Sequence, residues 1–462
     1  MLVKREHKQS LSSHLADWSS SLTLDDIPDD VVHSTKLRIL DTVGLMYAGA
    51  TLPVGRSVFE AMVEEGSTGS SSVVGFKTKA SPEVAAMVNG TCATILEFDD
   101  THVETAIHVS SPVVAAALAA GEACGVNGSE LIVAVAAATE LSCRLGLVAP
   151  GEFHRNAFHP TGVIGAFGAA YAAGRLFGLN AQQMANAIGV AGSQASGLTA
   201  SWVDGTDTKS MHGGWSAHCG IVSSKLASKG ITGPDLVFEG PLGLFRSHVQ
   251  QPVVALDYER ARKGLGEDWE SRSVAFKSYP TGGFNQGYVD AAFAILREQP
   301  LRPEDIAEII CPISEYIVGL VAEPVEQKLA PASSWQCRVS LPWSLAEAIV
   351  LGRLDRHAFN LQHPRVNEIR ALAQKIRHTI DPALADRRAW PGHVIIRMKD
   401  GTTHEKFVPH CLGSRENPHS DRDIVDKFMF NVSDQLGAES ARRLSTAILG
   451  LDPGASVRGV LQ

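Results

Sequence analysis

The sequence lacks the short motifs that identify the most common cofactor and metal sites. It contains no GxGxxG and no GxxxxGK[ST], the glycine-rich patterns that bind dinucleotides and nucleoside phosphates. It has no HExxH, and its seven cysteines include no CxxC pair and no zinc-ligand spacing. The sequence therefore signals neither dinucleotide nor nucleotide chemistry, and no metal site.

A surplus of basic residues and a membrane-length apolar run are also missing. The formal net charge is −9, with 44% hydrophobic and 20% charged residues, which is typical of a globular protein and argues against nucleic-acid binding. The longest Ala/Val-rich stretches, 112–121 and 131–139, are too short to span a bilayer. The N-terminus has no apolar core of signal-peptide length, and most cysteines stand in apolar runs. We expect a cytoplasmic protein that binds neither nucleic acid nor membrane.

What the sequence does have is a long first part rich in Ala, Gly and Leu. Helix-start residues precede several helix-length blocks, because Pro, Asn and acidic residues favour the first turn. Helices are expected over 31–47, 81–93, 127–145 and 180–191. Glycines recur among the alanines of this part and allow helices to approach closely. Residues 1–268 are therefore predicted to form a large all-helical domain.

The composition changes after about residue 268. Short β-branched runs predict strands over 307–313, 393–398 and 403–408, the last two joined as a hairpin. Helical patterns separate the strands, at 288–297, 341–351 and 366–376, and return at 421–430 and 437–449. The predicted fold class is mostly α, with a smaller α+β domain at 269–409 and a helical return at 410–462.

One short stretch concentrates acid/base groups. Glu97-Phe98-Asp99-Asp100-Thr101-His102 is followed six residues later by His108. Carboxylates and imidazoles exchange protons near neutral pH once their surroundings tune them. A capped loop or helix start is the alternative for such residues. Further clusters of histidine and lysine elsewhere in the sequence favour an acid/base site over this alternative.

Three other segments add histidine and lysine. His159 precedes Pro-Thr-Gly at a loop-to-helix boundary, where free backbone N–H groups can hold an anion. Lys209 and His212 are spaced to share one face of a helix. Lys277 precedes a Tyr-Pro turn at the start of the second domain. A pocket between the two domains would bring these groups to one small ligand.

Taken in order, seven segments resemble the MmgE/PrpD family, which includes 2-methylcitrate dehydratase, cis-aconitate decarboxylase and iminodisuccinate epimerase. The segments are LEFDDTH with the later His, FHPTGVIGAFGAA, AGSQASGL, KSMHGGWSAHCG, ITGPDLVFEGPLGLF, FKSYP and RVSLPW. The resemblance covers roughly residues 15–450. It implies a helical domain with an α+β lid, a homodimer, and chemistry that needs neither metal nor organic cofactor. Members move a proton at a carbon next to a carboxylate.

The resemblance also implies the site. Its predicted catalytic residues are Glu97, Thr101, His108, His159, Lys209 and Lys277. Its predicted substrate-binding residues are Asp100, His102, His212, Arg338 and Gln286.

This chain departs from the family pattern at several positions. Glu97 stands where members often have Asp, and Arg338 and Trp343 replace a Lys and a Tyr. After the Tyr-Pro turn many members carry Cys and then His, where this chain has Gly282 and Gln286. Because a glutamine side chain cannot transfer protons, these changes leave the particular reaction open.

We expect a lyase acting on a small di- or tricarboxylate, with dehydration preferred. Lys209 and Lys277 would hold carboxylates, His108 or His159 would transfer the proton, and Thr101 and His102 would orient the leaving hydroxyl or a neighbouring acid. Decarboxylation and epimerisation are the alternatives within the family. A non-catalytic ligand-binding homodimer is the alternative of another class.

Overall fold

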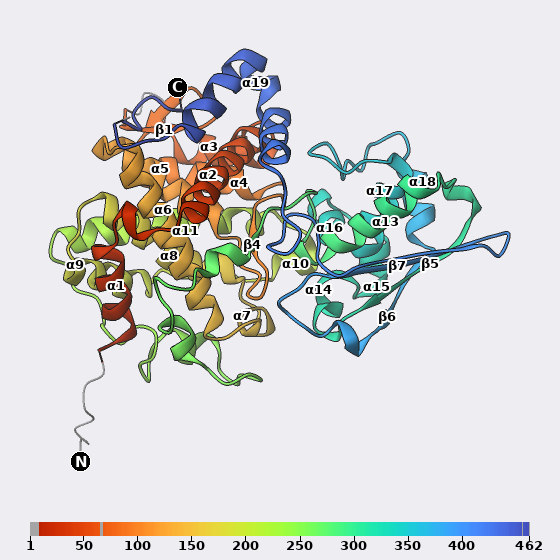
Figure 1. The fold of residues 1–462 in the computed structure, drawn as a ribbon, viewed down its shortest axis with the longest axis horizontal. Helices are drawn as coiled ribbons and strands as arrows, with labels where there is room; N and C mark the ends of the chain where they lie inside the picture. The colour runs from red at the N-terminus through yellow and green to blue at the C-terminus, as the bar shows by residue number, and fades with distance from the viewer. Residues whose placement is uncertain (1–8, 65–67, 455, 462) are drawn as a thin grey trace.

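The structure, a computed structural model, describes residues 9–64, 68–454 and 456–461. Two lobes lie side by side, a larger helical domain and a smaller α+β domain that we call the lid (Figure 1). The predicted fold class, a mostly helical protein with a second α+β domain, is confirmed.

The helical domain contains most of the helices. They are α1 (Leu11–Ser21), α2 (Asp29–Ala50), α3 (Pro53–Met62), α4 (Pro82–Thr94), α5 (Ser110–Cys124), α6 (Gly128–Leu147), α7 (Glu152–Arg155), α8 (Pro160–Leu176), α9 (Ala181–Ala191), α10 (Ser201–Asp204), α11 (Thr208–Ser228), α12 (Leu244–His248) and α19 (Asp421–Leu449). Two short pairs of strands accompany them, β1 (Ser71–Val73) with β2 (Thr78–Ala80) and β3 (Thr101–His102) with β4 (Val274–Ala275).

The helix starts follow the capping residues of the sequence. Asn127 opens α6 with a capping box that it forms with Glu130, and Asn180 opens α9 in the same way with Gln183. The four helices expected in the first part are α2, α4, α6 and α9, and all four are confirmed. The chain returns in α19, which packs against α2 (Figure 1).

Glycines let α4 and α11 approach each other closely. A side chain at Gly214 of α11 would collide with the backbone carbonyl of Met87 in α4, and one at Gly90 would lie 2.8 Å from Gly214 Cα. Only glycine fits such a contact. The close packing brings the C-terminal end of α4, which leads to Glu97, next to the first turn of α11, which carries Lys209.

The lid is built on a four-stranded sheet with the order β6-β5-β7-β8. Its strands are β5 (Ile306–Ile313), β6 (Ile376–Ile380), β7 (Gly392–Met398) and β8 (Thr403–Val408). Its helices are α13 (Gln286–Glu298), α14 (Val318–Val321), α15 (Val325–Leu329), α16 (Ser334–Arg338), α17 (Leu341–Leu351) and α18 (Val366–Ala373). The β7–β8 hairpin and the three predicted strands are confirmed.

The sequence prediction is wrong at one end of the lid. The helix expected over 366–376 ends at Ala373, and Ile376 begins β6, which pairs in parallel with β5. The strand has only five residues, of which only Ile376 is buried, and this pattern is too short and too irregular to distinguish it from a continuing helix. The two predicted C-terminal helices both lie within α19, and the backbone at Gly437 between them is not helical, with φ +72°, so the predicted division is confirmed.

The apolar core lies mainly in two large clusters. One fills the helical domain and includes Phe428 and Val432 of α19, and the other lies between the lid sheet and α13, α17 and α18. A small third cluster joins the domains, with Trp390 of the lid against Val103 and Ala275. Within the described residues, no helix is both long enough and apolar enough to cross a membrane.

Candidate active site

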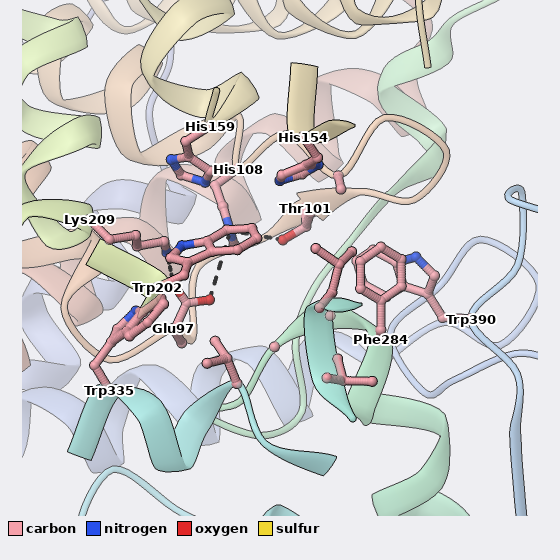
Figure 2. Close-up of a pocket in the computed structure, with 16 residues that line it drawn as sticks. Glu97, Thr101, His108, His154, His159, Trp202, Lys209, Phe284, Trp335 and Trp390 are labelled. Carbon is pink, nitrogen blue, oxygen red and sulfur yellow. Dashed lines mark hydrogen bonds and ion pairs between the residues drawn. The ribbon is translucent and has the colours of Figure 1, made fainter. Parts of the chain in front are cut away.

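A pocket lies where the lid meets the helical domain (Figure 2). Its empty space, counted out to its open mouth, is about 550 Å³. From the helical domain it is lined by Glu97, Thr101, Ala106, His108, His154, His159, Trp202 and Lys209. From the lid it is lined by Gly282, Gly283, Phe284, Leu320, Val321, Trp335, Val339 and Trp390.

Glu97 is the centre of the charged part of the pocket. Its carboxylate contacts the Lys209 ammonium through one oxygen, and its other oxygen lies 3.4 Å from Lys277 Nζ. Lys277 also donates to the backbone carbonyl of Glu97 at 2.9 Å. Glu97 adopts a left-handed backbone conformation with φ +53°, which is costly for a side chain with a Cβ and is characteristic of functional sites. The strained turn directs the carboxylate to both lysines.

The two lysines stand differently toward the pocket. Lys209 lines it, whereas Lys277 lies behind Glu97 and does not. Burial lowers the pKa of Lys277 to about 8. Burial and the nearby charge of Lys277 lower the pKa of Lys209 well below its usual range, and the Lys209 amino group contacts the Glu97 carboxylate. Lys209 is therefore the lysine that a ligand in the pocket meets, whereas Lys277 contacts Glu97 from behind.

His108 is held by two neighbours from the same segment. Its Nδ1 lies 3.0 Å from Thr101 Oγ1 and 3.3 Å from Asp99 Oδ1, and its Nε2 lies 3.8 Å from Glu97. Burial raises the pKa of Asp99, but His108 and Lys277 outweigh that effect and the net pKa is lowered. An ionised carboxylate at Nδ1 fixes the orientation of the imidazole and supports a proton at that nitrogen. The Nε2 atom is left on the side of Glu97.

His159 forms a pair with His212. Their Nδ1 atoms lie 3.0 Å apart, so one imidazole donates and the other accepts. Burial and the neighbouring histidines lower the pKa of His159 well below its usual range, and burial and Lys209 lower that of His212 to about 4. Both rings are therefore neutral near pH 7. His159 lines the pocket and His212 stands behind it, so a shift of the shared proton changes whether His159 Nε2 is a donor or an acceptor.

Two predicted substrate ligands in the first cluster are used elsewhere. Asp100 accepts from Arg38 at 2.7 Å and from the hydroxyl and backbone N–H of Ser110 at 2.6 and 3.0 Å. His102 pairs with Thr105 at 2.8 Å within the turn that follows β3. Neither lines the pocket, because alternate residues of this short extended segment point to opposite sides.

Two predicted ligands from the lid, Gln286 and Arg338, form hydrogen bonds with backbone groups of the protein. Gln286 bonds to the backbone of Ser278, Tyr279 and Thr281 and so holds the turn after Lys277. Arg338 donates to the carbonyls of Leu96 and Pro280 and lies 5.0 Å from the ring centre of Phe359. Asp100, His102, Gln286 and Arg338 do not line the pocket, and their role in substrate binding stays a prediction.

The sequence analysis missed several residues that line the pocket. His154 lies on α7 and stacks obliquely on Trp202, and burial lowers its pKa to about 3. The indole N–H groups of Trp202 and Trp335 are buried without a hydrogen-bond partner among the described residues. The spacing of His154 and His159 on either side of a helix boundary was a weak signal for the first. The sequence contains no signal for the two tryptophans, because isolated aromatic residues usually belong to a hydrophobic core.

Lys427 of α19 supports the site from outside the pocket. Its ammonium donates to Asp41 and to the backbone carbonyls of Phe98 and Lys277 at 3.0 and 3.1 Å. It also lies 3.8 Å above the Phe98 ring. One buried cation thus ties the C-terminal helix to the two segments that carry Glu97 and Lys277. In residues 9–64, 68–454 and 456–461, no group of three or more His, Cys, Asp or Glu is arranged to hold a metal ion.

Fold and site together describe a two-domain protein with a pocket lined by acidic and basic side chains at the domain junction. The chain belongs to the MmgE/PrpD family: the model of the MmgE/PrpD N-terminal domain matches residues 13–257, and that of the C-terminal domain matches residues 279–452.

The chain is similar to curated proteins of that family over nearly its whole length. It is 27% identical to a cis-aconitate decarboxylase of Aspergillus terreus, over 96% of this chain and 94% of that protein. It is 27% identical to the mouse cis-aconitate decarboxylase and 26% identical to the human one, covering 91% and 92% of those proteins. These relatives are lyases.

Proposed function

We propose that this protein is a lyase that removes carbon dioxide from a small unsaturated tricarboxylate of the cis-aconitate type. The observation that carries the proposal is the pocket itself, in which Glu97, Lys209 and three histidines face an apolar lid. The names of the similar proteins favour decarboxylation over the dehydration that the sequence analysis preferred.

The arrangement supplies what the reaction needs. The bond between the departing carboxyl and its methylene carbon breaks, and its electron pair becomes a new carbon–carbon double bond. The original double bond takes one proton at the carbon that bears a retained carboxylate. The products are carbon dioxide and a five-carbon unsaturated dicarboxylate.

The helical domain provides the polar groups for these steps. Lys209 has N–H groups beyond the one that contacts Glu97, and they are available to a retained carboxylate. Neutral His159 delivers the proton from Nε2 and regains one through His212. The buried N–H groups of Trp202 and Trp335 complete the set of donors for carboxylate oxygens.

The lid provides the apolar side of the pocket. A carboxylate held against Phe284, Leu320 and Val339 loses part of its hydration, and loss of carbon dioxide removes that charge. This feature supports decarboxylation, because dehydration would need an acid close to the leaving hydroxyl on the lid side as well. Dehydration of a hydroxy-tricarboxylate is the second candidate, supported by His108, because a proton held at Nδ1 by Asp99 leaves Nε2 as a proton acceptor.

A proton NMR time course with purified protein tests the proposal. Separate samples contain cis-aconitate, 2-methylcitrate and citrate, and carbon dioxide is measured in parallel. We expect loss of cis-aconitate with equimolar carbon dioxide. Formation of an alkene from a hydroxy acid without carbon dioxide would establish the second candidate instead. No change in any sample would refute a polycarboxylate lyase. Assembly as a homodimer stays a prediction, to be checked by sedimentation velocity.

A further inference from the structure

A second hollow opens directly beside the pocket. It has about 960 Å³ of empty space, including its open mouth, and lies between the helical domain and the lid. It shares with the pocket the lining residues Ala106, His154, Phe284 and Leu320. The two hollows therefore share a wall that includes His154, and Figure 2 shows His154 across the pocket from Lys209.

The acidic residues of the second hollow are already neutralised. Glu104 forms a two-pronged ion pair with Arg260, at 2.7 and 2.9 Å. Glu152 pairs with Arg155 at 2.9 Å and accepts the backbone N–H groups of Val253 and Val254. Because an arginine neutralises each carboxylate, neither one opposes the binding of an anion.

Arg387 is different. It comes from the lid segment between β6 and β7, and its guanidinium lies 4.5 Å from the ring centre of Tyr316. Among the described residues, no carboxylate lies within ion-pair distance of it, whereas the adjacent Arg388 pairs with Asp386 at 2.9 Å. Arg387 also reaches the helical domain, because a side chain at Gly151 would collide with its guanidinium. It is thus an unmatched cation held at the junction of the two domains.

We propose that Arg387 binds the outermost carboxylate of the substrate, which makes the protein selective for tricarboxylates over dicarboxylates. The inference rests on the proposed function, since it assigns a further subsite to the same pocket. Two carboxylates lie on the Lys209 side, and the third extends past His154 into the second hollow. A planar guanidinium with five donors suits a carboxylate that approaches from outside.

The position of His154 agrees with this assignment. It lines both hollows, and the charge of Arg387 contributes to lowering its pKa, after burial and His108. Since His154 is neutral near pH 7, it presents an uncharged ring between the two cations. The ligand therefore passes no fixed negative charge on its way from Lys209 to Arg387.

Binding of two matched probes tests the proposal by titration calorimetry on the full-length protein. Tricarballylate carries three carboxylates, and methylsuccinate is the same skeleton without one terminal carboxylate. Arg387→Gln should weaken tricarballylate binding about 10- to 100-fold, as loss of a charge-assisted hydrogen bond does, and methylsuccinate binding less than about threefold. Arg388→Gln removes the same charge one residue away, from a side chain that is 76% exposed, and should change neither.

The other outcomes are distinct. Equal weakening of both probes by Arg387→Gln would mean that the arginine steers anions or shapes the lid, and would overturn the subsite. Unchanged binding of both would overturn it too. If the wild-type protein binds neither probe, the polycarboxylate pocket itself is wrong, and the proposed function falls together with the inference.

Discussion

The helical domain lines its side of the pocket with Glu97, Lys209 and three histidines, whereas the lid lines the opposite side with apolar side chains and glycines. Among the described residues that line the pocket, every ionisable side chain comes from the helical domain. The difference separates two tasks. In the proposed function the helical domain holds charge and moves protons, and the lid supplies apolar contacts and, through Arg387 at its edge, selects the ligand.

The largest expected effect comes from the histidines of the helical side. His159→Gln or His108→Asn should lower kcat by about two to four orders of magnitude, as loss of a general acid or base does. Val339→Ala on the lid side should lower kcat/KM only about tenfold, because it removes apolar contact without touching proton transfer. Initial rates with cis-aconitate compare the histidine variants with the Val339 variant, using only variants whose melting temperatures match the wild type. Full activity in both histidine variants would remove the distinction between the two sides.

The next effect concerns the support beneath the helical side. Lys427→Met leaves the buried Asp41 carboxylate without its partner and should destabilise the fold by about 3–5 kcal/mol. The double variant Asp41→Asn/Lys427→Met should recover a large part of that loss. Urea unfolding monitored by circular dichroism measures both. If the single variant is as stable as the wild type, Lys427 does not support the site as its three acceptors indicate.

The pH profile sharpens the role of the lysine behind Glu97. Burial lowers the pKa of Lys277 to about 8, so its charge is present below pH 8 and lost above it. We expect kcat/KM to fall about tenfold per pH unit above pH 8, because the free enzyme then lacks that charge. Lys277→Arg should move the fall to higher pH, since arginine stays protonated. A profile that is flat to pH 9.5 would contradict the electrostatic role.

The acid side of the same profile tests the histidine pair. Burial holds the pKa of His159 well below its usual range, and that of His212 at about 4. Activity should therefore show no titration of this histidine pair between pH 7.5 and 6. The free energy of unfolding should decline as the pH falls from about 6.5 toward 4. In this range the histidines of the unfolded chain bind protons, whereas the buried histidines of the folded protein stay neutral. Thermal denaturation across this range measures that decline, and a melting temperature that rises on acidification would contradict it.

The smallest effect comes from Trp335, a lid residue that lines the pocket and whose indole N–H has no hydrogen-bond partner among the described residues. Trp335→Phe keeps an aromatic ring and removes only the indole N–H, so it should raise KM about tenfold and leave kcat within about threefold. Trp390 is the internal contrast, because its indole N–H already donates to the carbonyl of Val103. Trp390→Phe should loosen the domain junction and lower the melting temperature, with less effect on KM. Equal KM values for Trp335→Phe and the wild type would show that this N–H does not meet the ligand.

The sequence predicted the helical side better than the lid side for a physical reason. Glu97, Thr101, His108, His159 and Lys209 stand in dense polar clusters within apolar surroundings, and such residues are costly to bury without a role. All five line the pocket. The lid residues are isolated tryptophans, valines and glycines, which look like core residues until the fold brings them to one wall.

Several predicted ligands do not line the pocket, and the reason is that the sequence does not show which way their side chains point. Asp100 and His102 alternate with Asp99 and Thr101 along one extended segment, and a sequence does not show which of two alternating sets faces a pocket. Gln286 and Arg338 were assigned by resemblance, and here their hydrogen bonds are to backbone groups of the fold. The same holds for the lid sheet, where β6 begins at Ile376, the last residue of the predicted helix. Tertiary contacts decide each of these cases.

The most direct test of the division between the two sides is the fate of the proton. When the protein converts cis-aconitate in deuterated water, the product should carry one deuterium per turnover at the carbon next to a retained carboxylate. His159→Gln should slow this incorporation and turnover equally, and Trp335→Phe should leave one deuterium per product molecule. Product that forms without solvent deuterium at that carbon would contradict proton delivery by the helical domain.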